Sequence, residues 1–127
     1  MNGKQITFDF TYKAASSNKV VAEAIFILMQ RAINECSTLK IVHSQLVILP
    51  VEGWNSLPGF TSCLLLDSSH MTCHAYSPIG NQPGKMAVDI FSCGETPLMP
   101  IIRFLQHGIE KFLSDVFVFR IRESDRF

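Results

Sequence analysis

Apolar and polar residues alternate at the start of this chain, where the apolar positions are Ile6, Phe8, Phe10 and Tyr12. A two-residue period is typical of a strand with one buried face. Alternating or continuous apolar runs predict five further strands, at 39–49, 60–67, 69–74, 88–94 and 116–122. Glycine and proline are concentrated in residues 51–59 and 77–85, which predicts loops in those two places.

Two other segments repeat their apolar residues every three or four positions, which predicts amphipathic helices. The first follows Ser16 and Ser17, whose hydroxyls are suitable N-caps, and ends near Cys36. Its apolar stripe consists of Val21, Ala24, Ile25, Leu28, Met29, Ala32 and Ile33. The second helix is predicted to begin at Thr96-Pro97, a hydroxyl cap followed by proline at the first helical position. Its stripe consists of Leu98, Ile101, Ile102, Leu105, Ile109, Phe112 and Leu113.

The predicted order is strand, helix, four strands, helix, strand, within one domain that spans residues 1–127. Two amphipathic helices can cover only one face of such a sheet. The expected fold class is therefore α+β, a two-layer sandwich with a largely antiparallel sheet. The other sheet face must be polar or covered by a partner. The last strand is apolar on both sides for most of its length, which favours a homodimer; its apolar residues are Val116, Phe117, Val118, Phe119 and Ile121.

Charge and cysteine content narrow the choice of partners. Eleven basic residues balance eleven acidic ones, so neither nucleic acid nor an anionic membrane is an expected partner. The longest apolar segment, residues 20–29, contains Glu23 and is too short to span a bilayer. Nothing resembling a signal peptide precedes residue 8. The four cysteines show no Cys-x-x-Cys spacing; they are Cys36, Cys63, Cys73 and Cys93. These features predict a cytoplasmic protein with reduced thiols.

Two short segments carry most of the chemically reactive side chains. The first is Ser69-His70-Met71-Thr72-Cys73-His74, and the second is Val88-Asp89-Ile90-Phe91-Ser92-Cys93-Gly94. Both alternate like half-buried strands, and the turn-rich segment between them predicts a hairpin. Such a hairpin would bring a hydroxyl, two imidazoles and a thiol near one end of a sheet. This set of groups could support chemistry on the backbone itself.

Ser-His-x-Thr-x-His, followed by a hairpin and Val-Asp-x-Phe-x-Cys-Gly, resembles the small bacterial and archaeal S-adenosylmethionine decarboxylases. The resemblance is densest over residues 59–95 and extends, in the order of the elements, over most of the chain. It implies an inactive precursor that cuts its own backbone before a serine, here between Ser68 and Ser69. The products would be residues 1–68 and 69–127, and Ser69 would become a pyruvoyl group, the cofactor. It also implies a homodimer of cut protomers.

The resemblance further implies a role for each reactive side chain. Ser69 corresponds to the pyruvoyl precursor, whose ketone forms a Schiff base with the substrate amine. His74 corresponds to the histidine that accepts the proton during self-processing, and we expect it on a strand adjacent to Ser69, folding back toward the cut. Cys93 corresponds to the general acid that returns a proton to the substrate. Thr61 stands where the family usually has a serine that assists processing.

The chemistry of such a cut accounts for these residue types. The Ser69 hydroxyl attacks the Ser68 carbonyl and converts the amide to an ester, a step that is uphill in an unstrained chain. A base then removes the Cα proton of Ser69, and β-elimination releases residues 1–68 as a carboxylate. The remaining dehydroalanine hydrolyses to the pyruvoyl group and ammonia. Imidazole suits the role of base because it exchanges protons near neutral pH. We expect residues 67–70 to form a tight turn between two strands.

Several positions depart from the family pattern. Ser68 stands where glutamate is common, and that carboxylate helps relatives to bind substrate. Asp67 lies one position earlier and would point to the opposite face of a regular strand. The first strand lacks the usual Gly-x-His opening, and the hairpin loop from Ser77 to Lys85 is longer than usual. We therefore expect a divergent member.

This divergence leaves the substrate open. Decarboxylation of S-adenosylmethionine for spermidine and other polyamines is the leading interpretation, and an aromatic side chain such as Tyr76 or Trp54 would then bind the adenosyl sulfonium. The same chemistry on arginine or ornithine would instead require a carboxylate that faces the site, such as Asp89 or Glu95.

Two interpretations belong to other classes of protein. One is an uncleaved relative that binds and regulates a partner enzyme without catalysing a reaction, although such a protein would not need a serine, a histidine and a cysteine together. The other is a metal site. His70, His74 and Cys93 have suitable side chains but lack a recognisable ligand spacing, so we expect no metal.

Overall fold

The computed structural model describes residues 3–13, 16–113 and 115–126. Its strands and helices follow one another in the order predicted from the sequence. The strands are β1 (Lys4–Lys13), β2 (Ile41–Leu49), β3 (Gly59–Leu66), β4 (Ser69–Tyr76), β5 (Gly84–Ser92) and β6 (Asp115–Asp125). The helices are α1 (Asn18–Cys36) and α2 (Met99–Phe112).

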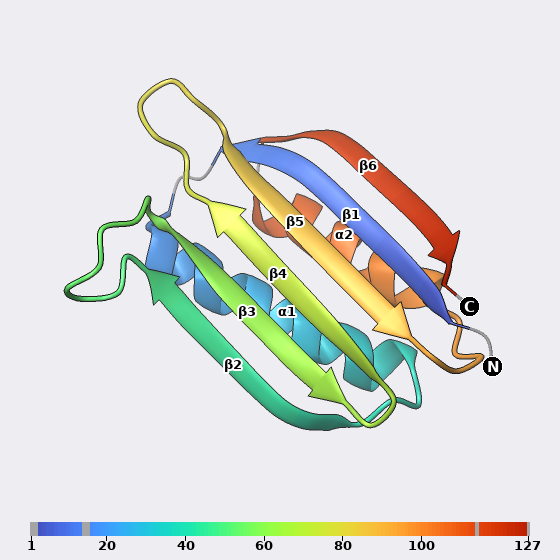
Figure 1. Cartoon of the computed structure of the whole chain (residues 1–127). Helices are drawn as coiled ribbons and strands as arrows, with labels where there is room; N and C mark the ends of the chain where they lie inside the picture. The colour runs from blue at the N-terminus through green and yellow to red at the C-terminus, as the bar shows by residue number, and fades with distance from the viewer. Residues whose placement is uncertain (1–2, 14–15, 114, 127) are drawn as a thin grey trace.

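These strands form one sheet in the order β2-β3-β4-β5-β1-β6, and every neighbouring pair is antiparallel. Both helices lie against the same face of the sheet (Figure 1). The predicted α+β two-layer sandwich is therefore confirmed. We refer to the covered side of the sheet as the helix face and to the other side as the open face.

The core lies between the helix face and the two helices. Alternate residues of four strands point into it and are almost fully buried, among them Ile6, Phe8, Phe60, Leu64, Met71, Val88 and Ile90. The helices complete it with Val21, Ile25, Met29, Ile33, Ile101, Ile102, Leu105 and Ile109. Burying each such large side chain stabilises the fold by about 1.5–3 kcal/mol. Because strand residues alternate between faces, this burial also fixes which side chains appear on the open face.

The two ends of the sheet differ in how the strands are connected. At one end, which we call the turn end, residues 67 and 68 link β3 to β4 beside the last residues of β5. At the other, the loop end, residues 50–58 link β2 to β3 and residues 77–83 link β4 to β5. Figure 1 shows both long loops on the same side of the molecule, away from the two chain termini.

The first helix begins as predicted, and the second does not. The Ser17 hydroxyl accepts a hydrogen bond from the Val20 backbone N–H and caps α1. For α2, the predicted start at Thr96-Pro97 is wrong: the N-cap is Leu98, whose side chain makes no capping bond, and Pro100 lies in the first turn. Proline is acceptable at any position of the first turn where a backbone N–H is not needed. A proline therefore indicates the region in which a helix begins, but not the exact residue.

The predicted apolar stripes are largely confirmed, with one exception in α2. Phe112, the last residue of that helix, is 40% exposed, whereas the next residue, Leu113, is buried in the core. In α1, the residue Ala22 is buried in addition to most of the predicted positions.

The last strand, β6, forms one edge of the sheet beside β1. Phe117 pairs with Thr11 and Ile121 pairs with Phe8, so these two apolar residues lie on opposite faces, and both are exposed. The side chains of residues 118 and 119, which also entered the expectation of a homodimer, lie outside the described part of the chain. Within the described residues, neither helix is long and apolar enough to cross a membrane.

Candidate functional site

The connection between β3 and β4 is a tight turn, as predicted. Asp67 and Ser68 are the only residues between the two strands. The Asp67 backbone N–H donates to the Lys40 carbonyl at 3.0 Å, and the Asp67 carboxylate accepts a hydrogen bond from the Lys40 N–H at 3.2 Å. These bonds tie Asp67 to the segment before β2. Its carboxylate is therefore engaged away from β5 and does not replace a glutamate at position 68.

Two donors from one residue converge on the Ser68 carbonyl oxygen. The Cys93 thiol donates to this oxygen at 2.9 Å, and the Cys93 backbone N–H donates to it at 3.4 Å. Cys93 is half-buried and follows the end of β5. Donors aimed at a carbonyl oxygen stabilise the negative charge that develops there during nucleophilic attack. The turn end of the sheet thus holds the features of an oxyanion hole.

The neighbouring hydroxyl, that of Ser69, is buried and has no hydrogen-bond partner in the described part of the chain. Ser69 pairs with Ser92 across β4 and β5, and Met71 and Cys73 on the same face of β4 are buried in the core. The Ser69 hydroxyl therefore lies on the helix face, and the Cys93 thiol lies on the other side of the same peptide unit. An unpaired buried hydroxyl is costly, which is typical of a group with a chemical task.

His74 lies elsewhere along the same strand. The prediction that it sits on an adjacent strand and folds back toward the cut is wrong, because β4 contains both Ser69 and His74 and is regular between them. Five residues of extended strand separate the two Cα atoms by about 16 Å. The His74 ring nitrogen Nδ1 shares a hydrogen bond of 2.6 Å with the Thr61 hydroxyl, and its ring contacts Tyr76 edge-on at 4.7 Å.

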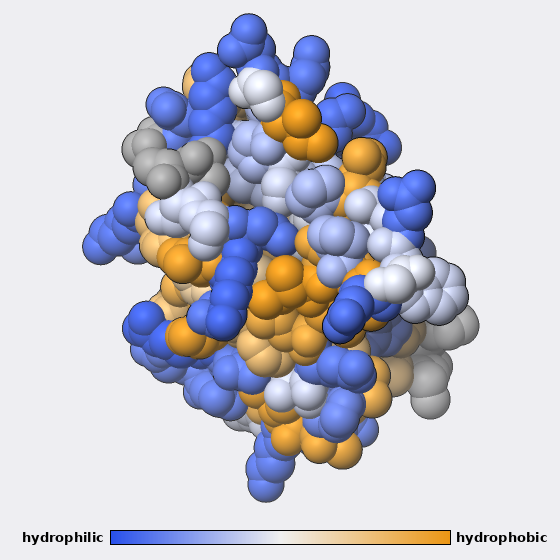
Figure 2. All heavy atoms as spheres, turned by 90° about the vertical axis from the view of Figure 1, so that its left-hand side faces the viewer, coloured by the Kyte–Doolittle hydropathy of each residue, from blue (hydrophilic) through white to orange (hydrophobic). Residues whose placement is uncertain are grey.

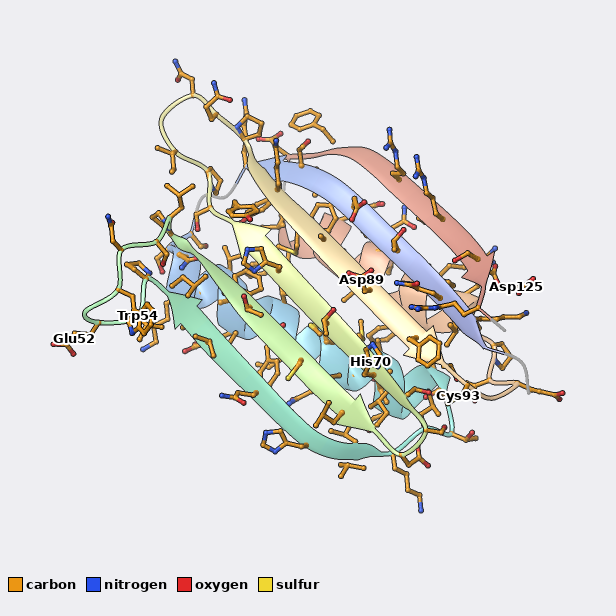
Figure 3. All side chains as sticks on the ribbon, viewed as in Figure 1. Glu52, Trp54, His70, Asp89, Cys93 and Asp125 are labelled. Carbon is orange, nitrogen blue, oxygen red and sulfur yellow. The ribbon has the colours of Figure 1, made fainter. Side chains whose placement is uncertain are left out.

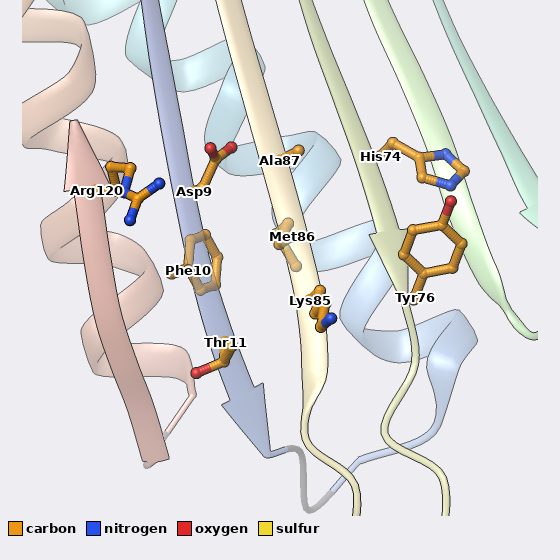
Figure 4. Close-up of a pocket in the computed structure, with 9 residues that line it drawn as sticks. All are labelled: Asp9, Phe10, Thr11, His74, Tyr76, Lys85, Met86, Ala87 and Arg120. Carbon is orange, nitrogen blue, oxygen red and sulfur yellow. The ribbon is translucent and has the colours of Figure 1, made fainter. Parts of the chain in front are cut away.

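Thr61 and His74 occupy one cross-strand row of the open face, which continues through Ala87, Asp9 and Arg120. A groove of about 360 Å³ lies along this row, toward the loop end (Figure 4). Its walls are formed by Asp9, Phe10, Thr11, His74, Tyr76, Lys85, Met86, Ala87 and Arg120. Asp9 and Arg120 escaped the sequence analysis, since only the pairing of the first and last strands brings them beside His74.

Aromatic and cationic side chains lie beside Cys93 on the open face. Phe91 precedes it by two residues on the same strand and pairs with His70, and their rings are 5.5 Å apart. The Arg126 guanidinium lies 5.5 Å from the centre of the Phe91 ring and donates a hydrogen bond to the Gln5 side chain. Sequence analysis did not single out Phe91, although its spacing from Cys93 on an alternating strand places both on one face.

The two aromatic residues that the sequence suggested for substrate binding lie at the other end of the sheet. Tyr76 is the last residue of β4, and Trp54 lies in the β2–β3 loop, with 76% of its surface exposed. Figure 3 shows Trp54 and Cys93 at opposite ends of the sheet. The same loop exposes Val51 and Leu57. Figure 2, which views the molecule from that side, shows hydrophobic residues mixed with hydrophilic ones over this surface.

The four thiols occupy different environments, and only one contacts the predicted cut. Burial, with a smaller contribution from Asp89, raises the pKa of the Cys73 thiol far above its usual value, so Cys73 is a protonated core residue. Cys36 and Cys63 are half-buried and unpaired by any disulfide. Cys93 alone donates to the Ser68 carbonyl.

The predicted meeting of the reactive groups at one end of the sheet does not occur within one protomer. Among the described residues, no three His, Cys, Asp or Glu side chains are arranged to hold a metal ion. Ser69, His70 and Cys93 lie at the turn end of the sheet, whereas His74 and Thr61 lie toward the loop end. The expectation that two imidazoles, a hydroxyl and a thiol share one end is therefore wrong for His74.

Comparison with known proteins adds one finding. A family model described as S-adenosylmethionine decarboxylase matches residues 8–120 of the 127-residue chain. No curated protein matches it. The matched span contains both ends of β4 and the whole hairpin that follows, and hence every site residue predicted from the sequence.

Proposed function

This chain belongs to the S-adenosylmethionine decarboxylase family, and on that premise we propose that it cuts its own backbone between Ser68 and Ser69 and then decarboxylates S-adenosylmethionine. Enzymes of this family are carboxy-lyases. The proposal includes a pyruvoyl group formed from Ser69 as the cofactor. It also assigns Cys93 as the proton donor in decarboxylation and His74 as the proton acceptor in processing.

The observation that carries the proposal is the pair of hydrogen bonds from Cys93 to the Ser68 carbonyl oxygen. This carbonyl belongs to the bond that would be cut, and the unpaired Ser69 hydroxyl belongs to the residue that would attack it. Donors in such positions stabilise the tetrahedral intermediate more strongly than they stabilise the resting amide. In enzymes of known mechanism, removal of one such donor slows the reaction by about 10²–10³. An ordinary strand turn has no need of a thiol in this place.

The residues at the turn end also fit the pyruvoyl group itself. When formed, this group supplies a ketone that withdraws electrons from the substrate as carbon dioxide leaves. Cys93 has the position to hold a proton beside the ketone, since its sulfur already lies 2.9 Å from the oxygen of residue 68. Ser68 is exposed, so the carboxylate released by the cut can enter solvent without a charge partner.

His74 cannot serve the same protomer's cut, so we infer that a second copy supplies it. A two-fold axis that lies between two open faces and runs across the strands would stack the loop end of one sheet over the turn end of the other. His74 and Thr61 of each copy would then face the Ser68–Ser69 bond of its partner. Isologous contacts of this kind are the commonest route to a homodimer. A dimer would also cover Phe117 on the open face.

The surroundings of Cys93 favour S-adenosylmethionine over arginine or ornithine. A guanidinium or ammonium tail would require a carboxylate that faces the site. Asp89 accepts a hydrogen bond from Gln5 at 3.5 Å, and Glu95 is exposed in the loop that follows Cys93. Phe91, by contrast, offers an aromatic ring two residues from the thiol. An aromatic face attracts a sulfonium cation and stacks with a purine.

Intact mass spectrometry of the purified protein tests the proposal. We expect two fragments, residues 1–68 and 69–127, the second without a free amino terminus and reactive toward carbonyl reagents. Ser69→Ala should remain one unbroken chain. Carbon dioxide released from labelled S-adenosylmethionine should exceed that from arginine or ornithine. A wild-type chain that stays whole, like Ser69→Ala, would contradict self-processing; release from arginine alone would contradict only the substrate.

A further inference from the structure

A second buried hydroxyl faces Ser69 across the sheet, and we propose that it positions the nucleophile for the cut. Ser92 is fully buried, on the helix face of β5, directly opposite Ser69. The proposal is that the Ser92 hydroxyl binds the Ser69 hydroxyl in the conformer that attacks the Ser68 carbonyl. It rests on the proposed self-processing and adds a positioning residue to it.

The pairing pattern brings these two side chains close together. The Cys93 N–H donates to the Ser68 carbonyl, so residues 68 and 93 form a hydrogen-bonded pair of the antiparallel ladder. The next pair, Ser69 and Ser92, is therefore a non-hydrogen-bonded pair. Cα atoms in such pairs are only about 4.5 Å apart, and their side chains approach more closely than in the alternate pairs. The proposal is that, at this separation, a change of the Ser69 χ1 rotamer brings its hydroxyl into contact with that of Ser92.

Hydrogen-bond accounting leaves Ser92 able to take this partner. Its oxygen accepts one bond, from the Gly94 backbone N–H at 3.3 Å, and a hydroxyl has a second lone pair and a proton of its own. Ser69 is the buried hydroxyl that lacks a partner among the described residues. The Gly94 bond fixes where the Ser92 oxygen lies. Three consecutive residues would thus act together. Ser92 would bind the nucleophile, Cys93 binds the carbonyl oxygen of Ser68, and the Gly94 N–H holds the Ser92 hydroxyl in place.

The step itself is an acyl shift that needs no further reactant. The Ser69 oxygen forms a bond to the carbonyl carbon of Ser68, the carbon–nitrogen bond between the two residues breaks, and the hydroxyl proton ends on the freed amine of Ser69. Ser92 accepts the Ser69 O–H as the attack begins. By restricting the hydroxyl to one rotamer, it raises the fraction of molecules in an attacking geometry. Ser92 forms no covalent bond and is unchanged at the end.

The test compares two buried serines of the same sheet face. Ser92→Ala should cut at least about tenfold more slowly than wild type, the effect expected from one hydrogen bond that is made in the attacking conformer. Ser62→Ala is the matched control, because Ser62 is also buried but donates to the Met29 sulfur. It should cut within about twofold of wild type. Ser92→Thr, which keeps the hydroxyl, should restore most of the rate.

Hydroxylamine separates positioning from a general loss of structure. This reagent cleaves the ester between Ser68 and Ser69, and the ester should accumulate in His74→Ala, where elimination is blocked. In excess hydroxylamine, the double variant of His74→Ala with Ser92→Ala should be cut at least about tenfold more slowly than His74→Ala alone, because its ester forms more slowly. Thermal melting of Ser92→Ala and Ser62→Ala in the Ser69→Ala background shows whether both remain folded.

The outcomes distinguish the two proposals. If wild type is cut and Ser92→Ala is cut at the same rate, or if hydroxylamine cuts the double variant as fast as His74→Ala alone, the role of Ser92 is overturned while self-processing stands. If Ser92→Ala melts like Ser62→Ala yet cuts slowly, and Ser92→Thr recovers, the role is supported. A wild-type chain that is never cut would remove both.

Discussion

The two ends of β4 present opposite kinds of chemistry on one continuous strand. At the turn end, the reactive groups act on the backbone: Cys93 binds the carbonyl of Ser68, and the Ser69 hydroxyl is buried without a partner. At the loop end, the His74 side chain binds the Thr61 hydroxyl, contacts the Tyr76 ring and lines an open groove. One end holds the bond that we propose is cut, and the other holds the proposed base.

If the proposed roles of these residues hold, a single protomer carries an incomplete site at each end. Both half-sites are well formed locally, since each has short hydrogen bonds and a fixed cross-strand register. Their distance is set by the length of the strand, which no side-chain rotation can change. A second copy, in which the ends are reversed, would complete both at once.

The largest effect is expected from His74→Ala, at the loop end. Loss of the general base should slow the second step of processing by about 10²–10⁴. Intact mass over time measures the fraction cut. Coexpression with Ser69→Ala should then produce mixed dimers in which the wild-type His74 of the Ser69→Ala chain serves the Ser69 of the other. Cutting of the His74→Ala chain should reappear in the mixture; if it stays absent, the base does not come from a partner.

Cys93→Ala, at the turn end, should have the next largest effect. It removes the thiol donor from the Ser68 carbonyl but leaves the backbone N–H in place. Cutting should slow by about 10²–10³ without stopping, and decarboxylation per cut subunit should fall further, since the proposed proton donor is lost. Cys63→Ala is the matched control, because it removes a thiol of similar burial that lies away from the cut. Turnover of Cys93→Ala equal to that of Cys63→Ala would refute the assignment of Cys93.

Replacements of Thr61 should give a smaller, graded effect at the loop end. Thr61→Val keeps the shape but removes the hydroxyl that bonds His74 at 2.6 Å, so the imidazole loses its orientation. Cutting should slow by about tenfold, the equivalent of one hydrogen bond. Thr61→Ser retains the hydroxyl and should cut like wild type. Equal rates for the two variants would mean that the hydroxyl does not orient His74 during processing.

Tyr12→Phe should have the smallest effect on processing and a distinct effect on stability. Burial, followed by the nearby Cys73, raises the pKa of Tyr12 to about 12 from 10.0. The neutral phenol is thus favoured in the folded state. The stabilisation that this group contributes is fully present below pH 10 and is lost as the pH rises toward 12. Urea unfolding of the Ser69→Ala chain at pH 8 and pH 11 should show a smaller drop for Tyr12→Phe. An identical drop would assign the alkaline loss to other groups.

The fold could be predicted well from the sequence, because each strand and helix is indicated by a pattern within a short stretch of residues. The alternation of residues 6–12 and the three- and four-residue steps in 21–33 each depend on a short window, and the layers follow from the number of helices. The errors occur where two signals compete. Thr96-Pro97 and Pro100 are both acceptable helix starts, and only packing of Leu98 against the core decides between them.

The site was predicted less completely, for a physical reason. The hairpin prediction placed Ser69 and Cys93 at one end of the sheet, and the structure confirms that placement and the tight turn, since neighbouring strands of a hairpin have a predictable register. The place of His74 required knowing that β4 stays extended from residue 69 to residue 76. Asp9 and Arg120 are 111 positions apart in the chain and meet only because β1 is inserted between β5 and β6. No local pattern encodes that insertion.

The strand order has a consequence for how the two fragments of the proposed cut stay together. Residues 1–68 contain β1, β2 and β3, and residues 69–127 contain β4, β5 and β6, yet the sheet order interleaves them. β1 of the first piece is clamped between two strands of the second, so the halves cannot drift apart while the sheet persists. Once melted, however, they are two separate molecules whose reunion depends on concentration. Maturation would thus turn a chain that refolds alone into an assembly that, once taken apart, must find its other half.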